Sequence, residues 1–188
     1  VTRMSAQASP SENPENVTIT NSTDSGFTVT WTTPDNATGV VLAKAGSKQI
    51  TAYDDRDRAG KQEKFTTHSV DVTGFPPQTP VDITLISNGK RVLTGGQPYK
   101  ATTAPSIPSG STNLEPAYGT VKGSDTLSAG GALIYLTVEG GQTLSALSNG
   151  SGNWIIPLNS LRTEDLTDYL PVTDRMTEAI IGRYNNEE

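Results

Sequence analysis

The stretch GFTVTWTTP, residues 26–34, decides the fold class of this chain. Its large apolar residues occupy every second position, with threonines between them. This period of two is typical of a β-strand that turns one face toward a hydrophobic core. Trp31 is in phase with Phe27 and Val29, so we predict that it packs in the core and does not stack on a ligand. Similar short segments recur along the chain, which predicts an all-β protein.

The composition agrees with this prediction and argues against several classes of function. The 188 residues include 18 glycines and 12 prolines, and only 18% are charged, as in proteins built from short strands joined by many turns. A net charge of −6 without runs of Lys or Arg argues against a nucleic-acid partner. No apolar segment is long enough to insert into a membrane. The absence of cysteine excludes disulfides, thiolate metal sites and cysteine nucleophiles.

Turn signals and polar segments divide the sequence into four parts. Residues 1–16 are polar and aperiodic, so we expect an extended arm. Residues 17–103 contain seven candidate strands, which indicates an immunoglobulin-like sandwich. Residues 104–117 hold three prolines with Ser and Gly and predict a stiff linker. Residues 118–188 predict a second small sandwich, so we expect two tandem immunoglobulin-like β-sandwiches.

Local patterns within the two predicted sandwiches give further expectations. The candidate strands of the first are 17–20, 27–33, 40–45, 48–53, 65–72, 81–87 and 99–103. Asn88-Gly89 predicts a tight hairpin, because both central residues of a type I′ turn need positive φ. In the second, RTEDLTDYLP (162–171) predicts one or two helical turns, since Thr163 can cap the helix and Pro171 can end it. The segment RMTEAIIGRY (175–184) predicts a closing strand.

The first sandwich resembles a fibronectin type III domain. Residues 17–46 and 67–90 carry this resemblance, chiefly the Trp31 strand and the corner GFPPQTPVDI at 74–83, and it covers roughly residues 15–104. The closest variant is that at the N-terminus of purple acid phosphatases and in many bacterial surface proteins. The family usually has a tyrosine where Val81 stands here, so the tyrosine-corner hydrogen bond should be missing.

The segment at 118–158 resembles a carboxypeptidase regulatory-like domain, which is a transthyretin-like sandwich. Together the two parts are similar to surface proteins of bacteria. Neither family carries catalytic residues of its own, so the resemblance implies a fold and no chemistry. The positions that match the second family are Gly119, Val121, Gly130, Ala132, Ile134, Leu136 and 152–154.

Catalysis by a histidine would have to use His68, the only one in the chain. It lies in TTHSVDV (66–72), in phase with Val70 and Val72, and no G-x-S-x-G segment presents a serine. We interpret His68 as structural. The protein is therefore expected not to be an enzyme and to need no cofactor.

The segment YDDRDRAGK (53–61) is the one candidate for a metal site. Calcium needs six to eight oxygen ligands, and Asp54, Asp55 and Asp57 could begin such a shell. However, Arg56 and Arg58 alternate with them and would neutralise their charge. We interpret the segment as a solvated, self-paired loop and keep calcium as the alternative.

These observations predict a non-enzymatic extracellular or cell-surface protein with a structural or adhesive role. Sandwich edges can accept a partner strand, and the polar arm or the tail at 175–188 could donate one to another copy or another surface protein. Head-to-tail pairing would give an open filament. One alternative is a binding module for glycan or a host surface that uses Tyr53, Tyr118 or Trp154; another is an accessory region of a larger secreted enzyme. The candidate binding and assembly residues are Trp154, Tyr118, Ile180, Ile181 and Tyr184.

Overall fold

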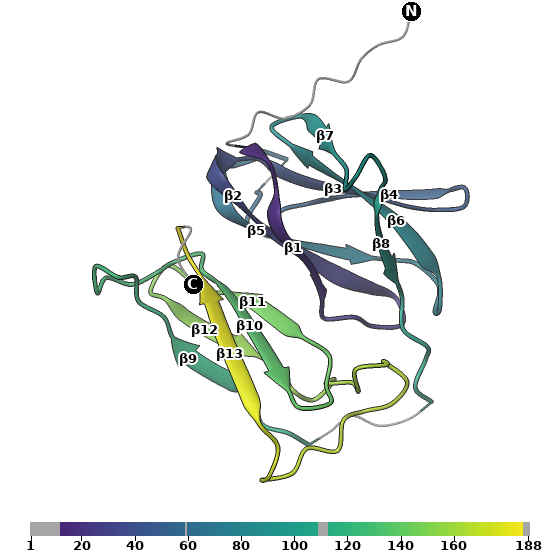
Figure 1. Cartoon of the computed structure of the whole chain (residues 1–188), viewed down its shortest axis with the longest axis vertical. Coiled ribbons are helices and arrows are strands. Elements are labelled where there is room, and N and C mark those ends of the chain that lie inside the picture. The colour runs from purple at the N-terminus through teal and green to yellow at the C-terminus, as the bar shows by residue number, and fades with distance from the viewer. Residues whose placement is uncertain (1–11, 59, 109–112, 186–188) are drawn as a thin grey trace, which may run out of the picture.

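The computed structural model describes residues 12–58, 60–108 and 113–185, and the predicted all-β class is confirmed (Figure 1). No α-helix occurs in these ranges. We call strands β1–β8 the N-terminal half: β1 (Glu15–Thr20), β2 (Gly26–Ala37), β3 (Gly39–Ala45), β4 (Lys48–Tyr53), β5 (Phe65–Thr73), β6 (Pro80–Ser87), β7 (Lys90–Val92) and β8 (Tyr99–Thr102). The C-terminal half contains β9 (Ala117–Thr120), β10 (Leu133–Val138), β11 (Leu144–Leu147), β12 (Asn153–Ile156) and β13 (Glu178–Arg183).

Two antiparallel sheets form the N-terminal half. One has the order β1-β2-β5, and the other has the order β4-β3-β6-β7 with β8 also paired to β6. The seven predicted strands are all found, and β2 continues to Ala37. The predicted hairpin is confirmed, because Asn88 and Gly89 have φ values of 46° and 77° between the paired strands β6 and β7.

The N-terminal arm was predicted to reach residue 16, and this boundary is wrong. β1 already begins at Glu15, and the preceding Glu12 contacts the β6–β7 hairpin. The Glu12 Oε1 atom accepts a hydrogen bond of 2.6 Å from Asn88 Nδ2, and Lys90 Nζ lies 3.5 Å from Oε2. The rest of the predicted arm, residues 1–11, lies outside the described residues.

The hydrophobic core of this half lies around the stretch that predicted the fold. Trp31 is fully buried in a cluster with Phe27 and Val29, so its predicted core position is confirmed. In the register of β2 and β5 it lies directly opposite His68, and the two rings stack with their centroids 4.7 Å apart. A Cβ atom at Gly39 would lie 2.5 Å from the His68 ring and 2.7 Å from that of Trp31, so the stack requires glycine there.

The C-terminal half has a separate, smaller core. It contains one sheet of order β11-β10-β13 and a two-stranded sheet of β12 and β9. The predicted closing strand is confirmed as β13, whose six residues pair antiparallel with β10 from Leu133 to Val138. The buried members of this second cluster are Ala129, Ala132, Ile134, Leu136, Val138, Leu144, Ile156, Leu161 and Leu170.

The predicted helical turn at 162–171 is wrong. The Asp165 carboxylate accepts hydrogen bonds from Thr163 Oγ1 at 2.6 Å and from the Thr167 backbone N–H at 3.1 Å. These bonds form tight turns, which compete with helical backbone bonding. Leu166 has φ of 65°, outside the helical region, and an isolated bridge pairs Arg162 with Tyr169.

Hydrogen bonds join the two halves where the β1-β2-β5 sheet lies beside β10 and β11 (Figure 1). The Tyr135 hydroxyl lies 2.9 Å from Thr30 Oγ1, and both side chains are buried. The Ser22 backbone N–H donates to Gln142 Oε1 at 2.9 Å. Buried polar groups that bond to one another in this way fix the relative position of the halves.

The segment predicted as a linker, 104–117, also contacts both halves. The Ala104 N–H donates to the Thr23 carbonyl at 2.8 Å. The buried Arg162 Nη1 donates to the Pro105 carbonyl at 2.7 Å and to the Leu166 carbonyl at 3.0 Å. At its C-terminal end, Ala117 already belongs to β9.

Candidate functional site

The five residues predicted for binding or assembly lie on two surfaces of the C-terminal half. Ile180 and Ile181 belong to β13, and Tyr184 follows it and packs partly against the second core cluster. Tyr118 and Trp154 belong to β9 and β12. The structure thus separates the two aliphatic candidates from the two on the β9–β12 sheet.

β13 is the exposed edge of its sheet. It pairs with β10 on one side, and no described strand pairs with its other side. Ile180 and Ile181 lie on opposite faces of the strand, yet their side chains are 48% and 41% exposed. An apolar edge strand of this kind is a template for pairing with another chain.

The β9–β12 sheet shows one aromatic residue to solvent and turns the other inward. Tyr118 is 77% exposed and lies opposite Ile155, which is 59% exposed. Trp154 instead lies over Gly119, where a Cβ atom would be 2.8 Å from the indole ring. The third candidate aromatic residue, Tyr53, lies at the end of β4 in the other half, away from β9 (Figure 1). The structure does not bring these aromatic side chains together.

The three aspartates of the 53–61 loop have separate partners. Asp54 is buried, and its Oδ1 accepts a hydrogen bond of 2.9 Å from Arg56 Nε. Asp55 accepts from Ser69 Oγ at 2.7 Å, whereas Asp57 accepts from the Glu63 N–H at 2.9 Å. Within the described ranges no group of three His, Asp or Glu side chains is placed to hold a metal ion.

Asp54 also approaches His68, whose side chain is fully buried. Nδ1 of His68 lies 3.3 Å from Oδ2 of Asp54, close enough for electrostatic attraction although the two are not aligned as a hydrogen bond. Burial alone would raise the pKa of Asp54, but His68 and Arg56 outweigh it and hold that pKa below its ordinary value. The loop carboxylate therefore serves as a buried ion-pair partner.

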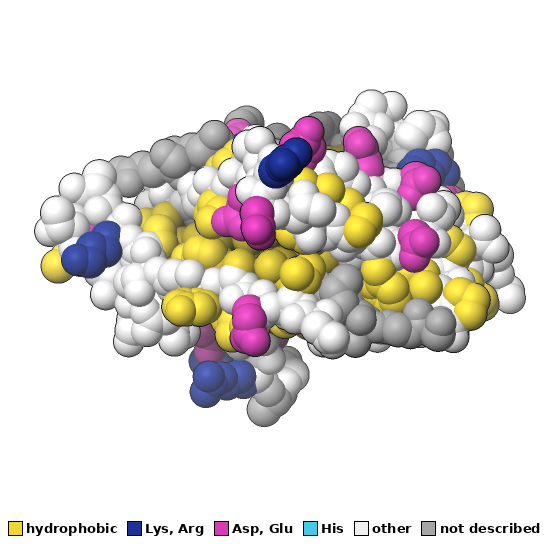
Figure 2. Space-filling view, turned by 90° about the horizontal axis from the view of Figure 1, so that it is seen from below, with side chains coloured by type: hydrophobic (Ala, Val, Ile, Leu, Met, Phe, Trp, Pro, Cys, Tyr) yellow, Lys and Arg dark blue, Asp and Glu magenta, His cyan; other side chains and the backbone are white. Residues whose placement is uncertain are grey.

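Acidic and hydrophobic side chains share the lower face of the molecule. Figure 2 shows hydrophobic side chains across the middle of this face, with acidic and basic side chains around them. Within the described residues there is also no helix long and apolar enough to span a membrane.

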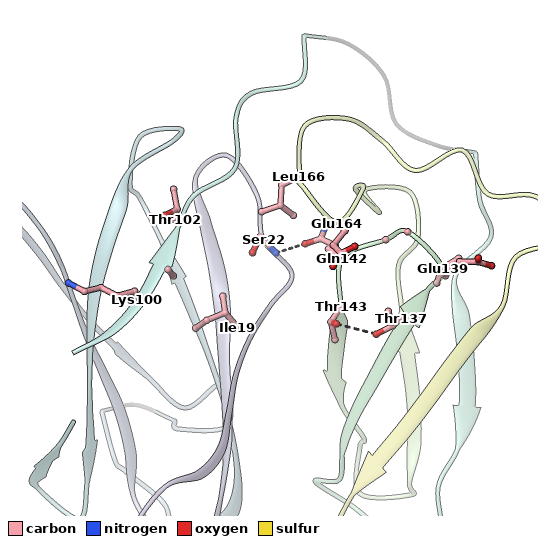
Figure 3. A pocket seen from close by; sticks show the side chains of 14 residues that line it. Ile19, Ser22, Lys100, Thr102, Thr137, Glu139, Gln142, Thr143, Glu164 and Leu166 are labelled. Atoms are coloured by element: carbon pink, nitrogen blue, oxygen red, sulfur yellow. Dashed lines mark hydrogen bonds between the residues drawn. The ribbon is translucent and has the colours of Figure 1, made fainter. Parts of the chain in front are cut away.

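A cleft of about 540 Å³ opens between the two halves (Figure 3). Glu139 and Glu164 line one side of it, and Lys100 lines the other. Two hydrogen bonds join polar groups of its lining: the Thr137 and Thr143 hydroxyls are 3.1 Å apart, and Gln142 accepts the bond from Ser22 shown in Figure 3. The Ser22–Gln142 bond joins the two halves, whereas the Thr137–Thr143 pair lies within the C-terminal half.

Two other sheet edges are covered, which the sequence pattern did not reveal. The Asn21 side chain closes the free edge of β11: its Oδ1 accepts from the Ser145 N–H at 2.9 Å, and its Nδ2 donates to the Ser145 carbonyl at 3.1 Å. Along β5, the Asp55 N–H donates to the Ser69 carbonyl at 2.9 Å, and Asp55 Oδ1 accepts from the Asp71 N–H at 3.1 Å. The edge of β13 has no such cover among the described residues.

Comparison with known proteins adds no relative. No protein-family model matches the sequence, and no curated protein is similar to it.

Proposed function

We propose that this chain is a non-enzymatic structural or adhesive protein of the cell surface or extracellular space. It would join other subunits by pairing strands at an open sheet edge. The observation that carries the proposal is the edge of β13, where Ile180 and Ile181 are exposed beside backbone groups with which no described strand pairs.

Three further features support a structural role. The resemblance of the two halves to fibronectin type III and carboxypeptidase regulatory-like domains implies no catalytic residues. His68 is buried and stacked on Trp31, and so is shielded from a substrate. Hydrogen bonds between buried groups such as Thr30 and Tyr135 fix one half to the other, which suits a protein that transmits force or holds a spacing.

In the proposed assembly, β13 has a different role from the one expected of the tail. The tail was expected to be a free donor strand, but β13 is paired with β10 in its own sheet. The proposal therefore makes β13 an edge that receives a partner strand. In this arrangement β13 stays in place and contributes its outward N–H and C=O groups.

A matched pair of charge substitutions tests the proposal. Ile181→Lys places a charge on the β13 edge, and Leu93→Lys places the same charge after β7 in the N-terminal half, at a residue that is 41% exposed, as is Ile181. We expect the wild type and Leu93→Lys to show a mass that increases with concentration in light scattering. Ile181→Lys should remain a monomer, because a lysine on an edge strand opposes pairing.

Negative-stain electron microscopy of the same samples gives the form of the assembly. Far-UV circular dichroism of both variants shows whether the fold is kept. A wild-type protein that stays monomeric at every concentration would refute the proposal, as would loss of assembly to the same degree in both variants.

A further inference from the structure

The phase of the β10–β13 ladder identifies which backbone groups face the open edge. The Glu139 N–H donates to the Thr177 carbonyl at 2.9 Å, so this opposed pair is hydrogen-bonded. Opposed pairs in an antiparallel ladder alternate between bonded and non-bonded. The backbone groups of Glu178, Ile180 and Gly182 therefore point away from β10, toward the open side.

The side chains of β13 include few of the features that protect an edge. Its central residues, 179–182, read Ala-Ile-Ile-Gly and contain neither a charge nor a proline. Charges occur at the two ends, with Glu178 at the start and Arg183 at the end. Natural edge strands are usually protected by a central lysine, a proline or a bulge.

The charges at the two ends of β13 indicate which kind of strand can pair with this edge. If a second β13 pairs antiparallel, the Glu178 end of each strand lies near the Arg183 end of the other. A parallel partner would bring like charges together at both ends. Antiparallel pairing of two identical strands is also what a two-fold axis produces, and two-fold dimers are the commonest homo-oligomers.

We propose that two copies of this chain pair through β13 around a two-fold axis, an inference that rests on the proposed function. The outward groups of Ile180 would bond to those of Ile180 in the second copy, and Glu178 would lie opposite Gly182, whose missing side chain leaves room. The result is a continuous six-stranded sheet of order β11-β10-β13-β13-β10-β11.

This arrangement closes on itself. The outer strand of the combined sheet is β11 at both ends, and the Asn21 carboxamide already bonds to the N–H and C=O of Ser145 there. A third copy therefore has no free edge in this sheet. Pairing through β13 gives a dimer and not a filament, in contrast to the head-to-tail contact expected from the sequence.

Single-cysteine crosslinking tests the two-fold geometry, because the chain contains no cysteine of its own. Ile180→Cys is treated with a short bismaleimide, and Leu93→Cys, at an exposed site after β7 in the N-terminal half, is the control. We expect about five-fold or more covalent dimer from Ile180→Cys, with no larger species, since a two-fold interface brings the same residue of both copies together.

A pair of proline substitutions provides a second readout. The Ile180 N–H points to the open side, so Ile180→Pro removes an outward donor and leaves the β10 ladder intact. The Ile181 N–H faces β10, and Ile181→Pro should lower the midpoint of thermal unfolding. In sedimentation velocity, Ile180→Pro should be a monomer that unfolds at nearly the wild-type temperature.

The outcomes separate this inference from the proposed function. Assembly without crosslinking at position 180, or an Ile180→Pro variant that still dimerises, overturns the β13 pairing and leaves assembly by another edge. A wild-type chain that sediments as a monomer at all concentrations overturns both.

Discussion

At the residue scale, the contacts of the buried Asp54 carboxylate give the 53–61 loop a structural role. Asp54 has a fully buried side chain that contacts Arg56 at 2.9 Å and His68 at 3.3 Å. Arg56 in turn covers the ring of Phe65, with its guanidinium carbon 3.5 Å from the ring centroid. Each charge in this cluster has a partner, which compensates for its removal from water. The pairing predicted within the loop is found between Asp54 and Arg56. The loop was also predicted to be solvated, but Asp54 is buried.

Asp55 gives a testable pH dependence. Burial, followed by repulsion from Asp71, raises the pKa of Asp55 to about 6. A carboxyl group with a raised folded-state pKa contributes stability below its unfolded pKa, near 4, and loses it as the pH rises through 6. Asp55→Asn should therefore be more stable than wild type at pH 7.5 and lose that advantage near pH 4. Because Asp55 contacts solvent, which screens the repulsion, the gain is at most about 1 kcal/mol.

The measurement is thermal unfolding at pH 7.5 and pH 4.5. For a chain of this size, the expected gain corresponds to an increase of roughly 1–4 °C in Tm at the higher pH. Asp174→Asn removes an equal charge at an exposed site and serves as the control. A difference between Asp55→Asn and wild type that is the same at both pH values would contradict the assignment.

At the element scale, β2 has two buried faces. Phe27, Val29 and Trp31 face the first core as the alternation predicts, but Thr28, Thr30 and Thr32 are also at most 6% exposed. The C-terminal half helps to cover this second face, where Thr30 meets Tyr135. Threonine suits such a face because it is β-branched and its hydroxyl can bond when buried.

The Thr30–Tyr135 contact can be tested by removing one hydroxyl. Tyr135→Phe should lower the free energy of unfolding by about 1 kcal/mol, because it deletes a buried hydrogen bond while Thr30 Oγ1 can still donate to the Thr18 carbonyl. Urea unfolding measures the change. Tyr53→Phe alters a tyrosine that is 53% exposed and should have no effect. Equal losses in the two variants would show that the contact contributes nothing of its own.

Strands were predictable from the sequence where local alternation was strong, as in β2 and β5, and hairpins where Asn-Gly required positive φ. The cover over the threonine face of β2 was not predictable, because it depends on contacts between residues more than 100 positions apart in the sequence, such as Thr30 and Tyr135. The helix predicted at 162–171 does not form, because Asp165 bonds to Thr163 and Thr167 in tight turns. Ile180 and Ile181 were predictable as strand residues, but the pairing of β13 with β10 was not.

At the scale of the whole molecule, the question is whether the two halves unfold together. The chain has two tryptophans, Trp31 in the first core and Trp154 beside the second. In the Trp154→Phe variant, Trp31 is the remaining tryptophan, so tryptophan fluorescence reports the unfolding of the N-terminal half. Far-UV circular dichroism reports the unfolding of both halves. Because the buried hydrogen bonds between the halves couple them, we expect the two signals to give the same urea midpoint.

Removing hydrogen bonds between the two halves should separate the unfolding transitions seen by fluorescence and by circular dichroism. Asn21→Gly, made in the Trp154→Phe background, removes the carboxamide that bonds to Ser145, and glycine accepts the φ of 51° found at this position. The half with the weaker core then loses the support of its neighbour, so the fluorescence and dichroism midpoints should differ. If the midpoints already differ without Asn21→Gly, the halves are independent modules on a connector. If they still coincide with it, the coupling lies in the remaining contacts, such as those of Arg162 with the Pro105 carbonyl.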